Sequence, residues 1–295
     1  MAEILTGAAS GARDPVLWND WHVIADLAAL RAGADFATTL LDVPLLARLG
    51  AAGAQARRAD GAPLHTEVAY GFLWACLGAP ARPLITIAEY AEAGRTIATG
   101  GSVGVHVAAP RVVENFLDLG HLGYVHVGYL GEEPETMVHP YRVGPLEGGG
   151  VLATGCKVYQ PVASPAAQGG YMVDYQYCVV RPLITCLHKA NPVARDAWDV
   201  IYLFVQPVSE ERSIAHTLML FAPDGTQPAD LRRFQQLIFL QDKPILENQT
   251  PRRLPLADGA ELPIAADSTS VAYRRYLVAE GLAYGVIPAG ARVAA

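Results

Sequence analysis

The chain has 295 residues, of which 52% are hydrophobic and 17% are charged. This composition excludes intrinsic disorder and coiled-coil rods, and it is sufficient for one large domain or two small domains with a buried core. The net charge of −7 offers no basic surface for phosphate backbones, so we expect no nucleic-acid partner.

Membrane insertion and secretion are not expected either. No apolar run approaches the roughly 18 residues that a membrane helix needs. Residues 1–13 lack the basic and apolar regions of a signal peptide. We therefore expect a cytoplasmic protein without a membrane partner.

The four cysteines are widely spaced and lie in apolar, strand-like contexts. No C-x-x-C pair is present, which argues against zinc ribbons and thioredoxin chemistry. Reduced thiols in the core are the expected state.

Taken in order, the predicted elements begin with short apolar segments over residues 18–50 and an Ala/Gly/Arg-rich surface loop over residues 51–62. The later strands are predicted at residues 70–77, 103–107, 137–143, 151–160, 171–181, 183–188, 199–206 and 213–221. Because the connections are too short for crossover helices, the sheet should be antiparallel and the fold α+β.

Three helices complete the predicted elements. The first covers residues 112–119, with Pro110 suited to its start. The second covers residues 228–248, and the third follows the N-cap residues Asp267 and Ser268 and ends near residue 280. A sheet that packs against a long helix creates a cavity between them.

The densest polar cluster in an apolar context contains Asp118, His121 and His126. In a regular helix, residues five apart point about 140° away from each other, so the two histidines could share one metal ion only if the helix ends or bulges between them. Gly120 and Gly123 would permit that distortion. The alternative is that both histidines simply form hydrogen bonds in the core or at the surface.

A second polar face is predicted on the long helix. Gln235, Phe239 and Asp242 are spaced at i−7, i−3 and i, which places an amide, an aromatic ring and an acid on one side. The alternative is that Asp242 is a solvated residue near Lys243.

These segments resemble the Rieske non-haem iron oxygenases over residues 71–277. The resemblance is carried by Asn115-x-x-Asp118-x-x-His121-x4-His126, by residues 241–249, and by Asp267-x5-Tyr273 with the residues up to Leu277. It implies that His121, His126 and Asp242 bind Fe(II) and that Asp118 is a catalytic residue beside them. If Asp242 is not the third ligand, Glu247 is the next candidate.

The same resemblance implies two domains. Residues 81–295 would form a helix-grip (START/Bet v 1-like) catalytic domain with an antiparallel sheet. Residues 1–80 would be a truncated remnant of an all-β Rieske domain, because the expected C-x-H and C-x-x-H pairs are missing and residues 51–68 contain no cysteine. The C-x-H of Cys186 and His188 has no C-x-x-H companion, so both are interpreted as ordinary strand residues.

In lacking the cluster ligands, the chain resembles the N7-demethylase subunits of bacterial methylxanthine breakdown. That branch implies oxidative N-demethylation of a methylxanthine or another small heteroaromatic substrate, with Gln235 and Phe239 as substrate-binding residues. It further implies O2 as co-substrate, no [2Fe–2S] cluster in this chain, and release of formaldehyde. Electrons would come from NAD(P)H through a Rieske-containing reductase, and the assembly would be a homotrimer or a hetero-oligomer.

Two competing functions remain open at this stage. The chain could be a metal-free helix-grip module that binds small molecules, or a silent structural subunit of an oxygenase complex. Retention of His121, His126 and Asp242 argues against the silent subunit.

Overall fold

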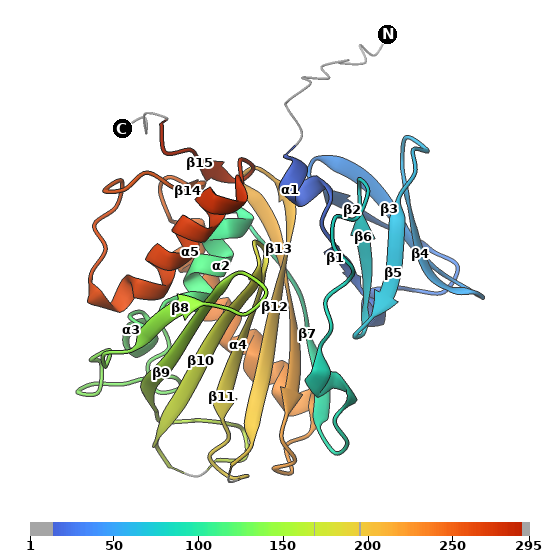
Figure 1. Cartoon of the computed structure of the whole chain (residues 1–295). Coiled ribbons are helices and arrows are strands. Elements are labelled where there is room, and N and C mark those ends of the chain that lie inside the picture. The colour runs from blue at the N-terminus through green and yellow to red at the C-terminus, as the bar shows by residue number, and fades with distance from the viewer. Residues whose placement is uncertain (1–13, 168, 195, 291–295) are drawn as a thin grey trace.

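The computed structural model describes residues 14–290 except residues 168 and 195. Seven strands form its main sheet in the order β7-β13-β12-β11-β10-β9-β8, and every neighbouring pair is antiparallel. The strands are β7 (Thr96–Val105), β8 (Arg142–Pro145), β9 (Val151–Gln160), β10 (Tyr171–Arg181), β11 (Ile184–Ala190), β12 (Trp198–Ser209) and β13 (Arg212–Phe221). Figure 1 shows helices behind this sheet and a smaller group of strands beside it.

The central strands of the main sheet are buried on both faces. In β12, Ile201 and Leu203 belong to a core that the sheet shares with the helices, whereas Tyr202 and Phe204 belong to a second core shared with the N-terminal strands. Successive side chains of a strand point to opposite faces. This explains why β12 is a nearly continuous apolar run rather than an alternating one.

The helices are α1 (Pro15–Trp18), α2 (Ala109–Leu117), α3 (Leu122–Val125), α4 (Pro228–Glu247) and α5 (Ser268–Glu280). Proline occupies the first turn of α2 and of α4, where its missing N–H has no helical partner to lose. Gly281 ends α5 in the left-handed conformation, with φ 78°. The long helix α4 lies along the sheet and forms one wall of an internal cavity.

The N-terminal strands form two three-stranded sheets with the orders β1-β6-β5 and β2-β3-β4. Their bounds are β1 (His22–Asp26), β2 (Asp35–Leu40), β3 (Val43–Gly50), β4 (Gly53–Arg58), β5 (His65–Ala69) and β6 (Phe72–Cys76). Trp74 packs edge-on against Phe204 of the main sheet, with ring centroids 4.9 Å apart. This aromatic contact joins the N-terminal strands to the outer face of the main sheet.

The remaining elements are short. They are the 3-10 helices η1 (Leu27–Ala29), η2 (Ala88–Ala91) and η3 (Ala265–Asp267), and the parallel pair β14 (Leu254–Pro255) and β15 (Val286–Ile287). None of the described helices is both long and apolar enough to cross a bilayer.

Three sequence predictions need correction. Residues 51–62 are a loop only at their two ends, because β4 (Gly53–Arg58) pairs with β3 in the middle and alternates alanine with polar or arginine side chains instead of large apolar ones. Residues 137–143 are not a strand over most of their length, since pairing begins only at Arg142. The helix predicted over residues 112–119 ends at Leu117, where Asp118 adopts an extended conformation.

Candidate metal centre

His121 and His126 lie on either side of the single helical turn α3. His121 is its N-cap and His126 its C-cap, and the N–H of Val125 donates to the carbonyl of His121 at 2.8 Å. The chain therefore brings the two imidazoles together by ending α2 and starting a new turn, not by a bulge within one helix. Their Nε2 atoms are 3.2 Å apart.

Asp242 reaches the histidines from the middle of α4. Its Oδ1 lies 3.4 Å from His121 Nε2 and 3.1 Å from His126 Nε2. His126 is fully buried and Asp242 is 8% exposed. Two segments more than a hundred positions apart thus place three metal-binding atoms around one point.

The outer nitrogens of both imidazoles have acceptors of their own. His121 Nδ1 lies 3.1 Å from Asp118 Oδ2, and His126 Nδ1 lies 2.9 Å from Gln241 Oε1. The N–H of Gly120 donates to Asp118 Oδ1 at 2.7 Å and fixes that carboxylate. A neutral imidazole that donates from Nδ1 presents a lone pair at Nε2, so both Nε2 atoms are acceptors at the centre.

This arrangement fits a cation. Asp242 Oδ1 is buried, and within the described chain it has no conventional hydrogen-bond donor. Three acceptor atoms in close contact repel one another unless a proton or a metal ion lies between them. Two imidazole nitrogens and one carboxylate are the ligand set of non-haem Fe(II) oxygenases, which leave other coordination positions open.

The pKa values of His121 and Asp242 reflect the same electrostatic environment. Burial lowers the pKa of His121, but its close contacts with the carboxylates of Asp118 and Asp242 together outweigh burial and raise the pKa to about 9. Burial raises the pKa of Asp242, and its close contacts with the two histidines together outweigh that effect and lower it. The centre thus stabilises positive charge strongly.

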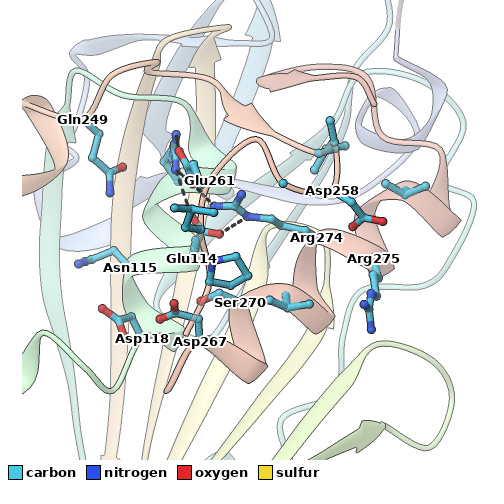
Figure 2. Close-up of a pocket in the computed structure, with 18 of the residues that line it drawn as sticks. Glu114, Asn115, Asp118, Gln249, Asp258, Glu261, Asp267, Ser270, Arg274 and Arg275 are labelled. Atoms are coloured by element: carbon cyan, nitrogen blue, oxygen red, sulfur yellow. Dashed lines mark hydrogen bonds and ion pairs between the residues drawn. The ribbon is translucent and has the colours of Figure 1, made fainter. Parts of the chain in front are cut away.

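The centre forms the wall between two cavities. An internal cavity of 80 Å³ lies between the sheet and α4, and both His126 and Asp242 line it. A larger outer pocket of 750 Å³ is lined by Asp118 and by α5 residues such as Arg274 (Figure 2). Asn115 and His121 line both. His121 therefore borders the internal cavity on one side and the outer pocket on the other.

The predicted substrate residues lie in the internal cavity. Gln235 and Phe239 line it together with Asp242, on the side of α4 that faces the sheet. The opposite wall includes Tyr177, Thr217 and the buried Lys189. The i−7, i−3, i spacing thus places all three helical residues on the cavity wall.

The other candidates lie elsewhere. Glu247 accepts a hydrogen bond from the N–H of His106 at 2.9 Å and pairs with Lys243, so it takes no part in the centre. His22 Nε2 contacts the Leu17 carbonyl at 2.8 Å, and His216 contacts Ser102 and Gln206. Cys186 and His188 lie together with Cys178 on the opposite face of the sheet.

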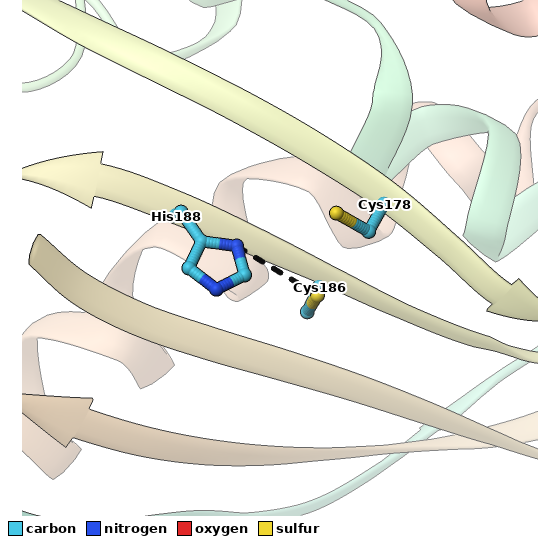
Figure 3. Close-up of side chains that lie close together, drawn as sticks. All are labelled: Cys178, Cys186 and His188. Atoms are coloured by element: carbon cyan, nitrogen blue, oxygen red, sulfur yellow. Dashed lines mark hydrogen bonds between the residues drawn. The ribbon is translucent and has the colours of Figure 1, made fainter. Parts of the chain in front are cut away.

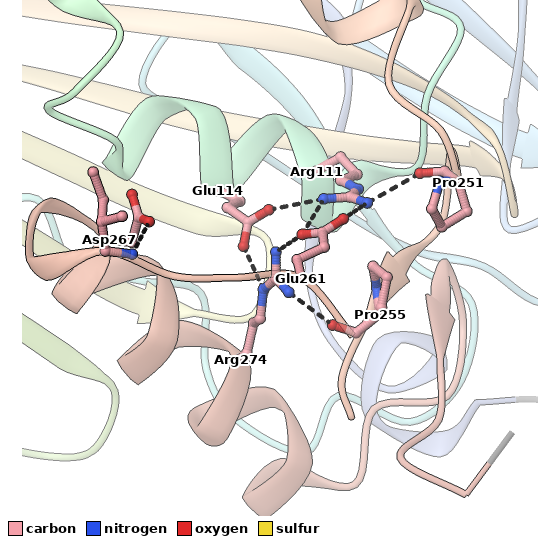
Figure 4. A network of polar contacts seen from close by, with 8 residues as sticks. Arg111, Glu114, Pro251, Pro255, Glu261, Asp267 and Arg274 are labelled. Atoms are coloured by element: carbon pink, nitrogen blue, oxygen red, sulfur yellow. Dashed lines mark hydrogen bonds and ion pairs between the residues drawn. The ribbon is translucent and has the colours of Figure 1, made fainter. Parts of the chain in front are cut away.

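Sequence reasoning missed two features, one hydrogen-bond partner of the centre and one network of charged residues next to it. The role of Gln241 could not be predicted because adjacent helix residues point about 100° apart. The position of Asp242 therefore did not indicate that Gln241 also contacts His126. The second is an ion-pair network that lines the outer pocket, formed by Arg111, Glu114, Glu261 and Arg274 (Figure 4). It joins α2, α5 and the segment before η3, which no local pattern connects.

Two comparisons with known proteins bear directly on this centre. Residues 105–280 match the family described as the vanillate O-demethylase oxygenase C-terminal domain. The chain is 39% identical to the probable methylxanthine N7-demethylase NdmC of Pseudomonas sp. (strain TJI-51), over 90% of this chain and 95% of that protein. The chain belongs to the Rieske-type oxygenases.

Solved Rieske-type oxygenases share its fold. NdmA of Pseudomonas putida CBB5 superposes with a TM-score of 0.70 at 16% identity, covering 89% of this chain and 90% of that one. NdmB of the same source gives a TM-score of 0.67 at 19% identity, covering 89% and 91%. The chain is accordingly an oxidoreductase of the Rieske-type oxygenase class, and this membership implies non-haem iron and O2.

Proposed function

We propose that this chain is the oxygenase component of an oxidative N-demethylase acting on a methylxanthine or a similar small heteroaromatic compound. The observation that carries the proposal is the convergence of His121, His126 and Asp242 at the wall of an apolar cavity. Its likeness to the methylxanthine demethylase NdmC supports the choice of substrate class. In fold terms we assign residues 81–295 to a helix-grip catalytic domain and residues 1–80 to the remnant of a Rieske domain.

His121, His126 and Asp242 would hold Fe(II). When bound, iron supplies a site at which O2 is activated for hydroxylation of an N-methyl group. Asp118 and Gln241 hold the two imidazoles by their Nδ1 atoms, which keeps both Nε2 lone pairs directed inward.

The overall reaction balances with one O2, two electrons and two protons. The N-methyl group becomes N–CH2OH, and the second oxygen atom leaves as water. The hemiaminal then loses formaldehyde, with its hydroxyl proton returning to nitrogen, and gives the demethylated product. The apolar lining of the internal cavity keeps bulk water from this step.

Substrate recognition is assigned to the α4 side of the cavity. A planar heterocycle could stack on Phe239 while the amide of Gln235 bonds ring carbonyl or nitrogen atoms. The cavity of 80 Å³ is smaller than the range usual for drug-sized ligands. Side chains of its wall must therefore shift when a bicyclic ring enters.

Electrons are assigned to a partner. The four cysteines include no C-x-H plus C-x-x-H set, so this chain has no complete ligand set for a Rieske cluster. The outer pocket beside Asp118 is the side from which a Rieske domain of another polypeptide could approach His121. NAD(P)H would act indirectly through that reductase, and the oxygenase would be a homotrimer or a hetero-oligomer.

Anaerobic reconstitution with ferrous ion tests the assignment. The wild-type chain should retain one iron per chain, while Asp242→Ala and His126→Ala should retain none with their circular dichroism unchanged. Glu247→Gln is the matched control, because this carboxylate is on the same helix but outside the centre. Full iron content in Asp242→Ala would refute the ligand set, and a wild-type chain that takes up no iron would favour a metal-free binding module.

A further inference from the structure

A second cluster of metal-binding side chains lies on the face of the main sheet that is turned away from the internal cavity. Cys178 of β10 and Cys186 of β11 are direct cross-strand partners. His188 is two residues further along β11, so it points to the same face as Cys186. Figure 3 shows the three side chains gathered between the strands.

The ligand atoms of these residues are close to coordination distance. The two Sγ atoms and one imidazole nitrogen all lie within 4.8 Å of one another, and Cys186 Sγ is 4.0 Å from His188 Nδ1. In a tetrahedral zinc site the bond lengths place sulfur and nitrogen about 3.6 Å apart. Side-chain shifts of a few tenths of an ångström would close that gap.

We propose that Cys178, Cys186 and His188 form a zinc site separate from the iron centre. Two thiolates and a neutral imidazole are donors that suit Zn²⁺. The two thiolate charges balance the charge of the ion, which a mostly buried site requires.

The histidine already has the outer-sphere partner that zinc ligands use. Its Nε2 lies 3.1 Å from Oε1 of Glu89, in η2. A carboxylate at one ring nitrogen fixes the tautomer that presents a lone pair at the other, here Nδ1 beside the sulfur. Bound zinc would therefore tie η2, which follows the N-terminal strands, to the centre of the main sheet.

Burial and access also suit a zinc ion. Cys178 and Cys186 are 8% and 1% exposed, whereas the His188 side chain is 25% exposed. A surface pocket of 240 Å³ lined by Glu89, His188 and Trp198 opens on the histidine. His188 is therefore the member of the cluster that borders solvent, while the two thiols are buried.

The site is independent of the proposed oxygenase activity. Leu187 and Lys189 of β11 line the internal cavity, and Cys186 and His188 alternate with them. A negative result for the proposed zinc site therefore leaves the proposed iron centre unaffected, and the reverse also holds.

Cobalt binding to the full-length chain tests the proposal. The Asp242→Ala variant removes the carboxylate ligand at the iron centre, and the reduced protein is titrated with Co²⁺ without oxygen. We expect one equivalent to bind with thiolate-to-cobalt charge-transfer absorption, and Zn²⁺ to displace it. Cys186→Ser should abolish the absorption. Cys156→Ser is the matched control, because this buried thiol of β9 lies outside the cluster and its loss should change nothing.

Two further variants keep the proposal testable if Cys186→Ser does not fold. His188→Gln changes a half-buried side chain and should abolish the absorption, while Glu89→Gln should weaken cobalt affinity by about 10- to 100-fold. Absence of charge-transfer absorption in reduced Asp242→Ala protein, or its persistence in Cys186→Ser, would overturn the proposal. The proposal is also overturned if protein purified without reductant contains a Cys178–Cys186 disulfide and its reduced form binds no cobalt.

Discussion

At the scale of single residues, Asp118 has the most distinctive position. It holds His121 through Nδ1 and also lines the outer pocket, so one carboxylate touches both the centre and the surface where we expect an electron donor. The shift in its pKa reflects this position: burial raises the pKa, and the contact with His121 together with backbone hydrogen bonds, including that from Gly120, outweighs burial and lowers it. Asp118 is thus held ionised beside a proposed metal ligand.

Asp118→Asn should slow turnover at least about tenfold and leave substrate affinity within twofold, because outer-sphere carboxylates orient ligands without contacting substrate. Steady-state turnover with a Rieske-bearing donor and equilibrium binding of substrate measure the two effects. Asp258→Asn is the control, since this residue lines the same pocket but does not contact a ligand histidine. A parallel loss of substrate affinity would contradict the role.

Gln235→Leu should weaken methylxanthine binding by about 1 to 3 kcal/mol, because polar atoms of the ligand would be left unpaired in the cavity. Calorimetric titration of the iron-loaded chain measures it. Gln236→Leu is the control, since the Gln236 amide donates to the Gly100 carbonyl at 3.0 Å on an exposed part of the helix. Equal affinities of wild type and Gln235→Leu across several methylxanthines would rule out this pose.

At the scale of elements, local signals were sufficient for much of the fold. Pro110 and Pro228 mark the starts of α2 and α4, and the apolar runs after residue 150 mark the long strands. Contacts that depend on how two strands pair could not be predicted from the sequence. Cys178 meets Cys186 only through the register of β10 against β11, and register is a property of two strands rather than of either one.

The proposed metal ligands could be predicted from the sequence because the motif and the helix spacing are local, whereas the roles of Gln241 and of the ion-pair network could not. Arg111 and Glu261 are 150 residues apart in the chain, yet their Nη2 and Oε1 atoms are 2.6 Å apart. No periodicity predicts such a contact, since it depends on how α2, α5 and the segment after β14 pack.

Glu114→Gln should destabilise the fold by about 3 kcal/mol, because it removes one partner of the buried guanidinium of Arg111, which is only 3% exposed. Its carboxylate also accepts from Arg274 Nε at 2.6 Å. Urea unfolding measures the difference. Asp230→Asn breaks the exposed pair with Arg233 and should change stability by less than about 0.5 kcal/mol. Comparable effects of the two variants would show that the network adds no stability.

At the scale of the whole molecule, the decisive expectation concerns electron supply. The purified chain should contain iron but show no [2Fe–2S] absorption, and it should release formaldehyde only when a Rieske-bearing partner and NAD(P)H are added. Absorption spectroscopy and a formaldehyde assay measure this. The control is a flavin reductase without a Rieske centre, and full turnover with that control would defeat the expectation.

The alternation along β11 also bears on how this protein can change over generations. Substitutions can alter Leu187 and Lys189 without touching Cys186 and His188, so the chemistry of one face can drift while the other is conserved. A deletion of one residue in β11 would instead change both faces at once. It would exchange the two faces of the strand beyond the deletion, turning a thiol and an imidazole into the internal cavity and Lys189 toward the aromatic core. We therefore expect lineages descended from this chain to differ in β11 by exchange of residues and to keep its length.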